Sequence, residues 1–419
     1  MSQTNDYPLS AVPQSARKGF WSTAFVLLGF TFFTSTMWAG GTLGTSFSFG
    51  ELLWIILIGN LLLGSYAAGL AYVAYKTGLN SVLLGRYCFG EQGSKLADFV
   101  LGFTQIGWYA WGTATIAIIL VKLLEWPESY TTPLMIVFGF GFCVTAFIGY
   151  QALALLSKIS VPAMLAFIGI SIYQGSIDIG GLAQLSNISP TDSMPFAAAI
   201  TMVFGTFVSG GTQATNWSRF AKSGRIAVVT TLLAFFIGNG LMVFVGAFGA
   251  MIYQQADIVD VLVAQGFILI AVLMLFANIW TTQDNTIYNF AAAGCNLLRT
   301  DKRRTITVVG AAIGTVLAVF GMYNMLIPFL ILLGTFIPPI GAIIMADFWF
   351  KHRSNPPSLD KIKLPAFDAC GLSAYAVGSA AAYFSPWIAP LVGIVVSASV
   401  YALLLYIRSA QPVAKPSAS

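Results

Sequence analysis

One apolar stretch of the chain, residues 263–297, carries polar side chains whose spacing suits the binding of a cation. Asn278, Thr282 and Asn285 follow the i, i+4, i+7 rule and therefore share one face of a helix. Thr281 places a second hydroxyl beside Thr282, one turn after the backbone carbonyl of Asn278. Neutral oxygen atoms of this kind suit a hard cation such as sodium. The alternative is a packing interface in which the hydroxyls hydrogen-bond to their own helix.

A second constellation places an amide beside an indole on the apolar stretch 97–122. Gln105 and Trp108 are three residues apart and share one face, with glycines nearby that leave space. A flat heteroaromatic ligand would stack on Trp108 while Gln105 hydrogen-bonds to its edge, and Phe204 would cover the opposite face. Stacking of a base on an aromatic side chain contributes about 1–3 kcal/mol. The alternative is that Trp108 is an ordinary packing residue in a chain that is 14% aromatic.

Two apolar stretches are interrupted near their middle by glycine and small polar residues, at 29–41 and at 204–213. A helix that unwinds inside a membrane frees backbone N–H and C=O groups, which must then bind something else. At the first interruption, the carbonyls of Gly29 and Phe32 would complete the cation site. A matched pair of interrupted helices is typical of the central site of a secondary transporter. Alternatively, the small residues let neighbouring helices pack closely.

Composition places the chain among membrane proteins and narrows its possible functions. Hydrophobic residues make up 57% of the 419 residues, charged residues 8%, and the mean hydropathy is +0.81, whereas soluble domains carry roughly 25% charged residues. The chain has one histidine, four cysteines without metal-ligand spacing and no motif such as HExxH, so we expect neither an enzyme nor a cofactor. The basic residues are too dispersed for nucleic-acid binding. Nothing indicates an obligate protein partner.

Apolar runs of about 20 residues predict an all-α protein with twelve transmembrane helices in a lipid bilayer. Their expected cores are 20–41, 50–74, 97–122, 132–150, 153–173, 195–217, 226–252, 263–297, 305–322, 325–349, 366–384 and 387–407. With a cytoplasmic N-terminus, 19 of the 20 Lys and Arg residues lie on the inner side, and Lys122 alone lies outside. This segregation predicts that both termini are cytoplasmic. The segment 78–94 is expected to lie at the cytoplasmic interface.

The spacing of the two interruptions predicts an inverted repeat. Helices 1–5 (residues 19–174) and helices 6–10 (residues 195–350) would have opposite orientations, with the discontinuous helices 1 and 6 crossing near the membrane midplane. Two extra helices follow at 365–408. Residues 1–18 and 409–419 are expected to form cytoplasmic tails.

Several motifs together resemble the nucleobase–cation symport family in its purine-cytosine permease branch. They are VPQSARKG at 12–19, FFTSTMWAGGTLG at 32–44, QIGW at 105–108, NIWTTQDN at 278–285 and IPPIGAIIMAD at 337–347. The similarity extends over essentially the whole chain. It implies a leucine-transporter-type 5+5 inverted-repeat fold with two extra helices. It also implies uptake of cytosine across a bacterial inner membrane by alternating access, with a cation, here sodium, as the coupling ion.

The resemblance also assigns roles to individual residues. The sodium position of the family falls on the carbonyls of Gly29, Phe32 and Asn278 and on the hydroxyls of Thr281 and Thr282. Its aromatic pair around the base falls on Trp108 and Phe204, where more distant members have tryptophan in place of the phenylalanine. More distant members carry an amide where this chain has Gly112, and Gln105, one turn before Trp108, is expected to take over that role. The helix face, not the resemblance, predicts a contact of the base with Asn285. The polar edge of the base is also expected to meet the chain at the two interruptions, at Phe33 and Thr34 and at Gly205 and Thr206.

Two other transporters of the same fold fit these residues. A proton-coupled nucleobase transporter would depend on Asp284, the one serious proton-carrier candidate within an apolar stretch. An amino-acid and cation symporter would bind a carboxylate at the interrupted helices. The choice of cytosine over uracil or hydantoins follows mainly from the resemblance, because the amides of Gln105 and Asn285 can exchange donor and acceptor.

Overall fold

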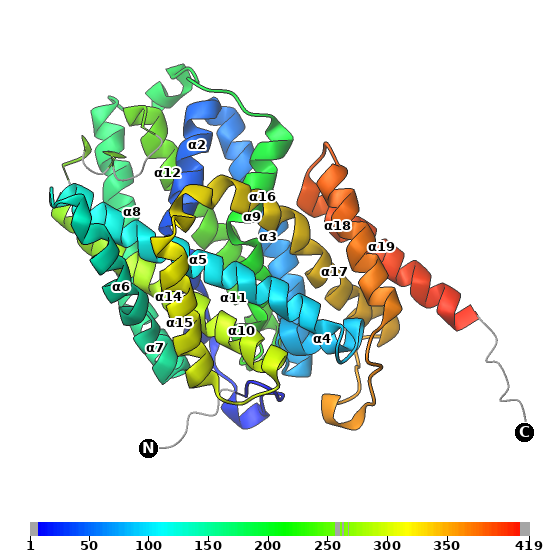
Figure 1. Cartoon of the computed structure of the whole chain (residues 1–419). Coiled ribbons are helices and arrows are strands. Elements are labelled where there is room, and N and C mark those ends of the chain that lie inside the picture. The colour runs from blue at the N-terminus through cyan, green and yellow to red at the C-terminus, as the bar shows by residue number, and fades with distance from the viewer. Residues whose placement is uncertain (1–6, 256–259, 262–263, 267, 411–419) are drawn as a thin grey trace, which may run out of the picture.

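The computed structural model describes residues 7–255, 260–261, 264–266 and 268–410, which form a bundle of helices (Figure 1). These described residues contain no β-strand and one isolated bridge, between Lys18 and Ala221. Seven helices within them are long and apolar enough to cross a membrane, and a bent pair at the N-terminal end makes an eighth. The expectation of an all-α membrane protein is therefore confirmed.

The helices follow one another closely along the chain. Those of the first half are α1 (Phe20–Thr31), α2 (Thr34–Ser46), α3 (Phe49–Thr77), α4 (Ser81–Phe89), α5 (Ser94–Leu123), α6 (Thr131–Gly141), α7 (Cys143–Ile148) and α8 (Tyr150–Asp178). Those of the second half are α9 (Phe196–Gln213), α10 (Thr215–Ser218), α11 (Gly224–Leu232), the π-helical η4 (Leu233–Gly238), α12 (Asn239–Tyr253), α14 (Ile268–Leu298), α15 (Arg303–Val319), α16 (Leu326–Phe336), α17 (Pro338–Ala346), the π-helical η6 (Asp347–Lys351), α18 (Ala369–Phe384) and α19 (Ala389–Ala410). Within the described residues, the expected cores fall on these helices or on consecutive groups of them, and residues 263 and 267 of the eighth core lie outside the described residues.

The first expected interruption is present between α1 and α2. Phe32 and Phe33 have extended backbone, with φ of −76° and −135°, and the two helices meet at an angle of 55°. The chain leaves α1 after the N–H of Phe32 has bonded to the carbonyl of Leu28 at 3.0 Å. Carbonyls in the last turn of α1 are therefore available to groups outside the helix.

The second expected interruption is wrong, because α9 continues without a break from Phe196 to Gln213. Its small residues serve close packing instead. A Cβ at Gly210 would lie 2.7 Å from ring carbons of Phe30 and Phe207, and one at Gly205 would lie 3.2 Å from the carbonyl oxygen of Leu330. The packing explanation therefore holds for this helix.

The segment expected at the cytoplasmic interface forms helix α4, which other helices bury. All of its residues except Arg86 are buried, and it packs against α5, α17 and α18. A helix that is apolar around most of its circumference is stable only when other elements cover it. Helices α2 and α12 approach closely, since a Cβ at Gly40 would lie 2.1 Å from the carbonyl oxygen of Val243.

The N-terminal segment 7–18, expected as a tail, packs against the ends of α3 and α10. The N–H of Val12 donates to the carbonyl of Gly78 at 3.0 Å, and Arg17 Nη1 donates to the carbonyl of Ala221 at 3.1 Å. Residues 9–11 and the connection 354–360 line one cavity of about 300 Å³. The N-terminal segment and the connection that follows η6 therefore lie at the same end of the molecule, at the bottom of Figure 1.

Candidate functional site

The break between α1 and α2 lies against α14, where backbone carbonyls meet threonine hydroxyls. Thr282 Oγ1 lies 3.1 Å from the carbonyl oxygen of Phe32 and 3.3 Å from that of Phe30, so the two carbonyls share the single donor of its hydroxyl. Thr281 Oγ1 donates to the carbonyl of Asn278 at 2.8 Å. All five residues are buried. The structure thus brings Phe32 of the break to Thr282 of α14. The Thr281 hydroxyl instead bonds within its own helix, as the packing alternative expects.

Gly29, the remaining predicted cation ligand, packs against α8. A Cβ at this position would lie 2.5 Å from Ser157 Oγ, so a larger residue would force α8 away. Ser157 is 1% exposed, and its hydroxyl has no hydrogen-bond partner among the described residues. Sequence reasoning missed Ser157 because a single serine on an apolar helix has no informative spacing. Its hydroxyl is a neutral oxygen of the kind that suits a hard monovalent cation such as sodium.

Trp108 lies at the centre of an aromatic cluster beside the break. Its ring meets Phe33 edge-on at 5.6 Å between centroids and Phe329 at 5.3 Å. Its indole Nε1 donates to Ser209 Oγ of α9 at 3.2 Å. The indole is therefore held between the break, α9 and α16. These contacts fix the orientation of the indole ring through one hydrogen bond and two aromatic neighbours.

A small cavity of about 10 Å³ lies between these side chains. Its lining residues are Phe30, Phe33, Gln105, Trp108, Thr206, Phe207, Ser209, Gly210, Thr282 and Thr286. This volume holds about one water molecule, so a planar base would enter only if the walls moved apart. The structure therefore brings together, in a closed form, the predicted residues Phe33, Gln105, Trp108, Thr206 and Thr282.

Three of the predicted substrate residues lie outside this cavity lining. The Phe204 ring packs against Tyr66 with centroids 5.7 Å apart, and Phe207 of the same helix lines the cavity instead. Gly205 packs against α16, as described above. The Asn285 amide donates to the carbonyl of Thr281 at 2.6 Å. The roles of these three residues stay predictions.

Thr34 is the first residue of α2, and its side chain lies outside the described part of the structure.

Two polar residues of the lining, Ser209 and Thr286, were not predicted as ligands, although their spacing along the helices was informative. Ser209 lies three residues after Thr206 on α9, and Thr286 lies four residues after Thr282 on α14. The same helical rule that selected Thr282 would have selected Thr286. The Thr206 side chain is fixed by a hydrogen bond from α12, since its Oγ1 accepts from the amide of Asn239 at 3.1 Å.

Gln105 presents a hydrogen-bond donor that the described residues do not use. Its side chain is 1% exposed, and its Oε1 accepts from Asn289 at 3.5 Å while Nε2 has no partner. A buried donor without a partner costs about 1–3 kcal/mol. An acceptor on a bound ligand would relieve this cost. The amide therefore favours a ligand that brings an acceptor to the cavity.

The sequence of the chain is similar to those of known membrane permeases. The family model described as permease for cytosine/purines, uracil, thiamine and allantoin matches residues 11–403. The cytosine permease of Escherichia coli strain K12 is 39% identical over 404 residues, which cover 96% of this chain and 95% of that protein.

Solved structures share the arrangement of helices. Mhp1, a nucleobase-cation-symport-1 family transporter in a closed conformation with bromovinylhydantoin bound, superposes with a TM-score of 0.85 at 16% identity, covering 97% of this chain and 96% of that one. A Na⁺-coupled sialic acid symporter in a substrate-bound outward-open state gives a TM-score of 0.70 at 12% identity, covering 96% of this chain and 92% of that one. The fold is therefore that of these transporters.

Replacing the Thr282 hydroxyl should destabilise the break. Thr282→Val is expected to lower the free energy of unfolding by about 1–3 kcal/mol, because the buried carbonyls of Phe30 and Phe32 would lose their donor. Thr286→Val is the matched control, since the Thr286 hydroxyl donates within its own helix, to the carbonyl of Thr282 at 2.7 Å. Unfolding in detergent measures both variants. Equal stability of the two would contradict this role of Thr282.

Proposed function

The chain belongs to the family of permeases for cytosine/purines, uracil, thiamine and allantoin, and from this premise we propose that it imports cytosine by sodium-coupled symport. As a member of this family, it is a multi-pass inner-membrane transporter and not an enzyme. The observation that carries the proposal is the contact of Thr282 with the carbonyls of Phe30 and Phe32. This contact joins the interrupted first span to the helix that bears the predicted cation ligands.

Sodium would be held by the oxygens gathered at this contact. Its expected ligands are the carbonyls of Gly29, Phe32 and Asn278 and the hydroxyls of Thr281 and Thr282, and the unpartnered hydroxyl of Ser157 is an additional candidate. The ion supplies positive charge that attracts carbonyl oxygens from both helices. Because it contacts α1 and α14 together, it would favour the conformation in which the break and α14 are close. Coupling follows if cytosine binds this conformation more tightly.

Cytosine would bind where the small cavity beside Trp108 lies, once the surrounding helices have moved apart. Its ring would stack on Trp108, and Gln105 Nε2 would donate to an acceptor on the edge of the base, either O2 or N3. The 39% identity to the Escherichia coli cytosine permease supports cytosine as the substrate. The Gln105 amide alone would not distinguish cytosine from uracil, because it can exchange donor and acceptor. Backbone groups at the break cannot exchange in this way, so they would have to supply the selectivity.

Alternating access would require this cavity to open toward each side in turn. We propose twelve spans, with inverted repeats at 19–174 and 195–350, and the TM-score of 0.85 to Mhp1 supports this architecture. The basic loops favour a cytoplasmic location for both termini. The close packing of α9 implies that opening proceeds by relative movement of whole helices, since Gly210 leaves no space for local change.

Proton coupling is the second candidate, and one buried carboxyl group favours it. Asp284 is 0% exposed on α14 and accepts a hydrogen bond from the Asn285 amide at 3.0 Å. Ionisable groups inside a membrane are rare and usually functional. Asp284 does not line the cavity, however. An amino-acid substrate is less favoured, because none of the residues that line the cavity carries a charge to pair with a carboxylate.

Sodium dependence should disappear when both hydroxyls are removed. In proteoliposomes, labelled cytosine should accumulate under an inward sodium gradient, and Thr281→Ala combined with Thr282→Ala should abolish the stimulation by sodium. Asp284→Asn serves as the comparison, because it should retain sodium-stimulated uptake. Loss of uptake in Asp284→Asn, together with unchanged sodium dependence in the double variant, would instead favour the proton-coupled mechanism.

Stacking on Trp108 should account for part of the affinity for cytosine. Trp108→Ala is expected to weaken cytosine binding by about 1–3 kcal/mol, which corresponds to roughly 5–150-fold in the dissociation constant. Phe103→Ala on the same helix is the control, since Phe103 is 45% exposed and faces away from the cavity. Equilibrium binding of labelled cytosine measures both. A dissociation constant that Trp108→Ala leaves unaltered would exclude the stacking role.

A further inference from the structure

A basic cavity of about 660 Å³ lies at the end of the molecule where η6, α18 and α19 meet, far along the chain from the residues of the candidate site. Cavities of this size are typical of sites for small molecules. Four cationic side chains line it, namely Lys351, Arg353, Lys363 and Arg408. The proposed transport function uses none of them.

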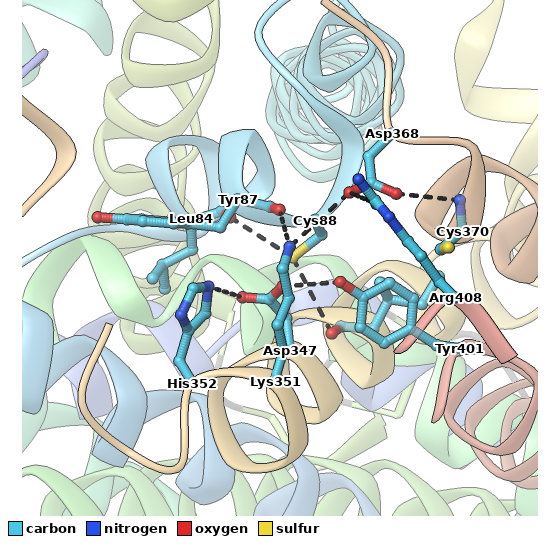
Figure 2. Close-up of polar contacts among 11 residues, drawn as sticks. Leu84, Tyr87, Cys88, Asp347, Lys351, His352, Asp368, Cys370, Tyr401 and Arg408 are labelled. Carbon is cyan, nitrogen blue, oxygen red and sulfur yellow. Dashed lines mark hydrogen bonds and ion pairs between the residues drawn. The ribbon is translucent and has the colours of Figure 1, made fainter. Parts of the chain in front are cut away.

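Two of these four cations, Lys351 and Arg408, are already paired with carboxylates (Figure 2). Lys351 Nζ lies 3.1 Å from Asp347 Oδ1, which also accepts from the Tyr401 hydroxyl at 2.7 Å. Asp368 Oδ2 lies 3.8 Å from Lys351 Nζ and 3.5 Å from Arg408 Nη1. These two carboxylates are buried, and each is paired with at least one of the cations.

The other two cations, Arg353 and Lys363, make no ion pair or side-chain hydrogen bond within the part of the chain that the structure describes. Both residues are exposed. His352 also lines the cavity, but burial lowers its pKa from the ordinary value of 6.5, so its imidazole is uncharged at pH 7. The four cations and two carboxylates leave the cavity with a net positive charge, which Arg353 and Lys363 present at its opening.

The cavity opens among apolar and aromatic side chains at the outer edge of the bundle, which α18 and α19 form (Figure 1). Phe350 and Tyr406 line it and are 63% and 72% exposed, and Leu405 lines it as well. Trp349 and Phe367 are exposed nearby. Exposed aromatic side chains of this kind gather where a membrane meets water. These exposed side chains favour a location of the cavity at the level of lipid head groups.

We propose that this cavity binds the phosphate group of an anionic phospholipid. The Arg353 guanidinium can hold two phosphate oxygens at once, and the Lys363 ammonium adds a second positive charge. The rim of Phe350, Leu405 and Tyr406 would contact the glycerol and the first carbons of the acyl chains. Basic pockets between transmembrane helices bind anionic head groups in this way. The bound lipid would anchor α18 and α19 to one leaflet.

Native mass spectrometry of the purified full-length protein tests this site. We expect dioleoylphosphatidylglycerol to form adducts at lower concentrations than dioleoylphosphatidylcholine does. Arg353→Gln and Lys363→Gln should each weaken the binding of phosphatidylglycerol about fivefold, since each cation near an anionic head group contributes comparably. Lys361→Gln is the matched control, because Lys361 is exposed on the same connection and does not line the cavity. It should leave binding unchanged.

Several outcomes would overturn the proposal. They are unchanged phosphatidylglycerol binding in the combined Arg353 and Lys363 variant, equal binding of the two lipids, and displacement of the lipid by millimolar inorganic phosphate, which would indicate a site for free phosphate. An acidic protein that copurifies in place of the lipid would also contradict it. Cytosine binding by the combined variant should stay unchanged, because Gln105 and Trp108 line a separate cavity. Failure here is therefore distinguishable from failure of the transport proposal.

Discussion

Backbone groups inside a membrane need partners, and this constraint explains why the break at Phe32 and Phe33 lies where it does. Water cannot satisfy carbonyls that a helix gives up at this depth. The Thr282 hydroxyl meets the carbonyls of Phe30 and Phe32 at 3.3 and 3.1 Å, so α14 supplies the partner that α1 has lost. A cation with neutral oxygen ligands would satisfy the same carbonyls more strongly. The break and α14 are therefore best understood as one unit.

The helices around this unit hold it in a closed form. Gly40 lets α2 approach the backbone of α12, and Gly210 lets α9 approach the Phe30 ring of α1. The cavity that remains has room for about one water molecule. Binding of a base would therefore have to move whole helices apart, and the energy for that movement would come from stacking, from the unpaired Gln105 amide and from the cation. This dependence links substrate binding to the conformation of the bundle.

The two glycine-rich interruptions show what sequence can predict here and what it cannot. Both combine glycine with serine and threonine, yet the chain breaks only at 32–33, while α9 runs on to Gln213. The two sites differ in what surrounds the backbone. At the first, the Thr282 hydroxyl donates to a carbonyl that the helix has left free, and at the second, the Phe30 ring fills the space beside Gly210. Helical spacing predicted Thr282 and the pair of Gln105 and Trp108, which line one cavity in the structure. Ser157 was not predictable, since its position beside Gly29 depends on the packing of α8.

The most direct test of this account is the effect of sodium on the melting temperature of the purified protein without substrate. Choline would replace sodium to keep the ionic strength constant. A cation shared by α1 and α14 binds the folded state alone, so the melting temperature should rise with sodium concentration as expected for a single binding site. A melting temperature that does not change, or that rises equally with potassium, would contradict a sodium site at the break.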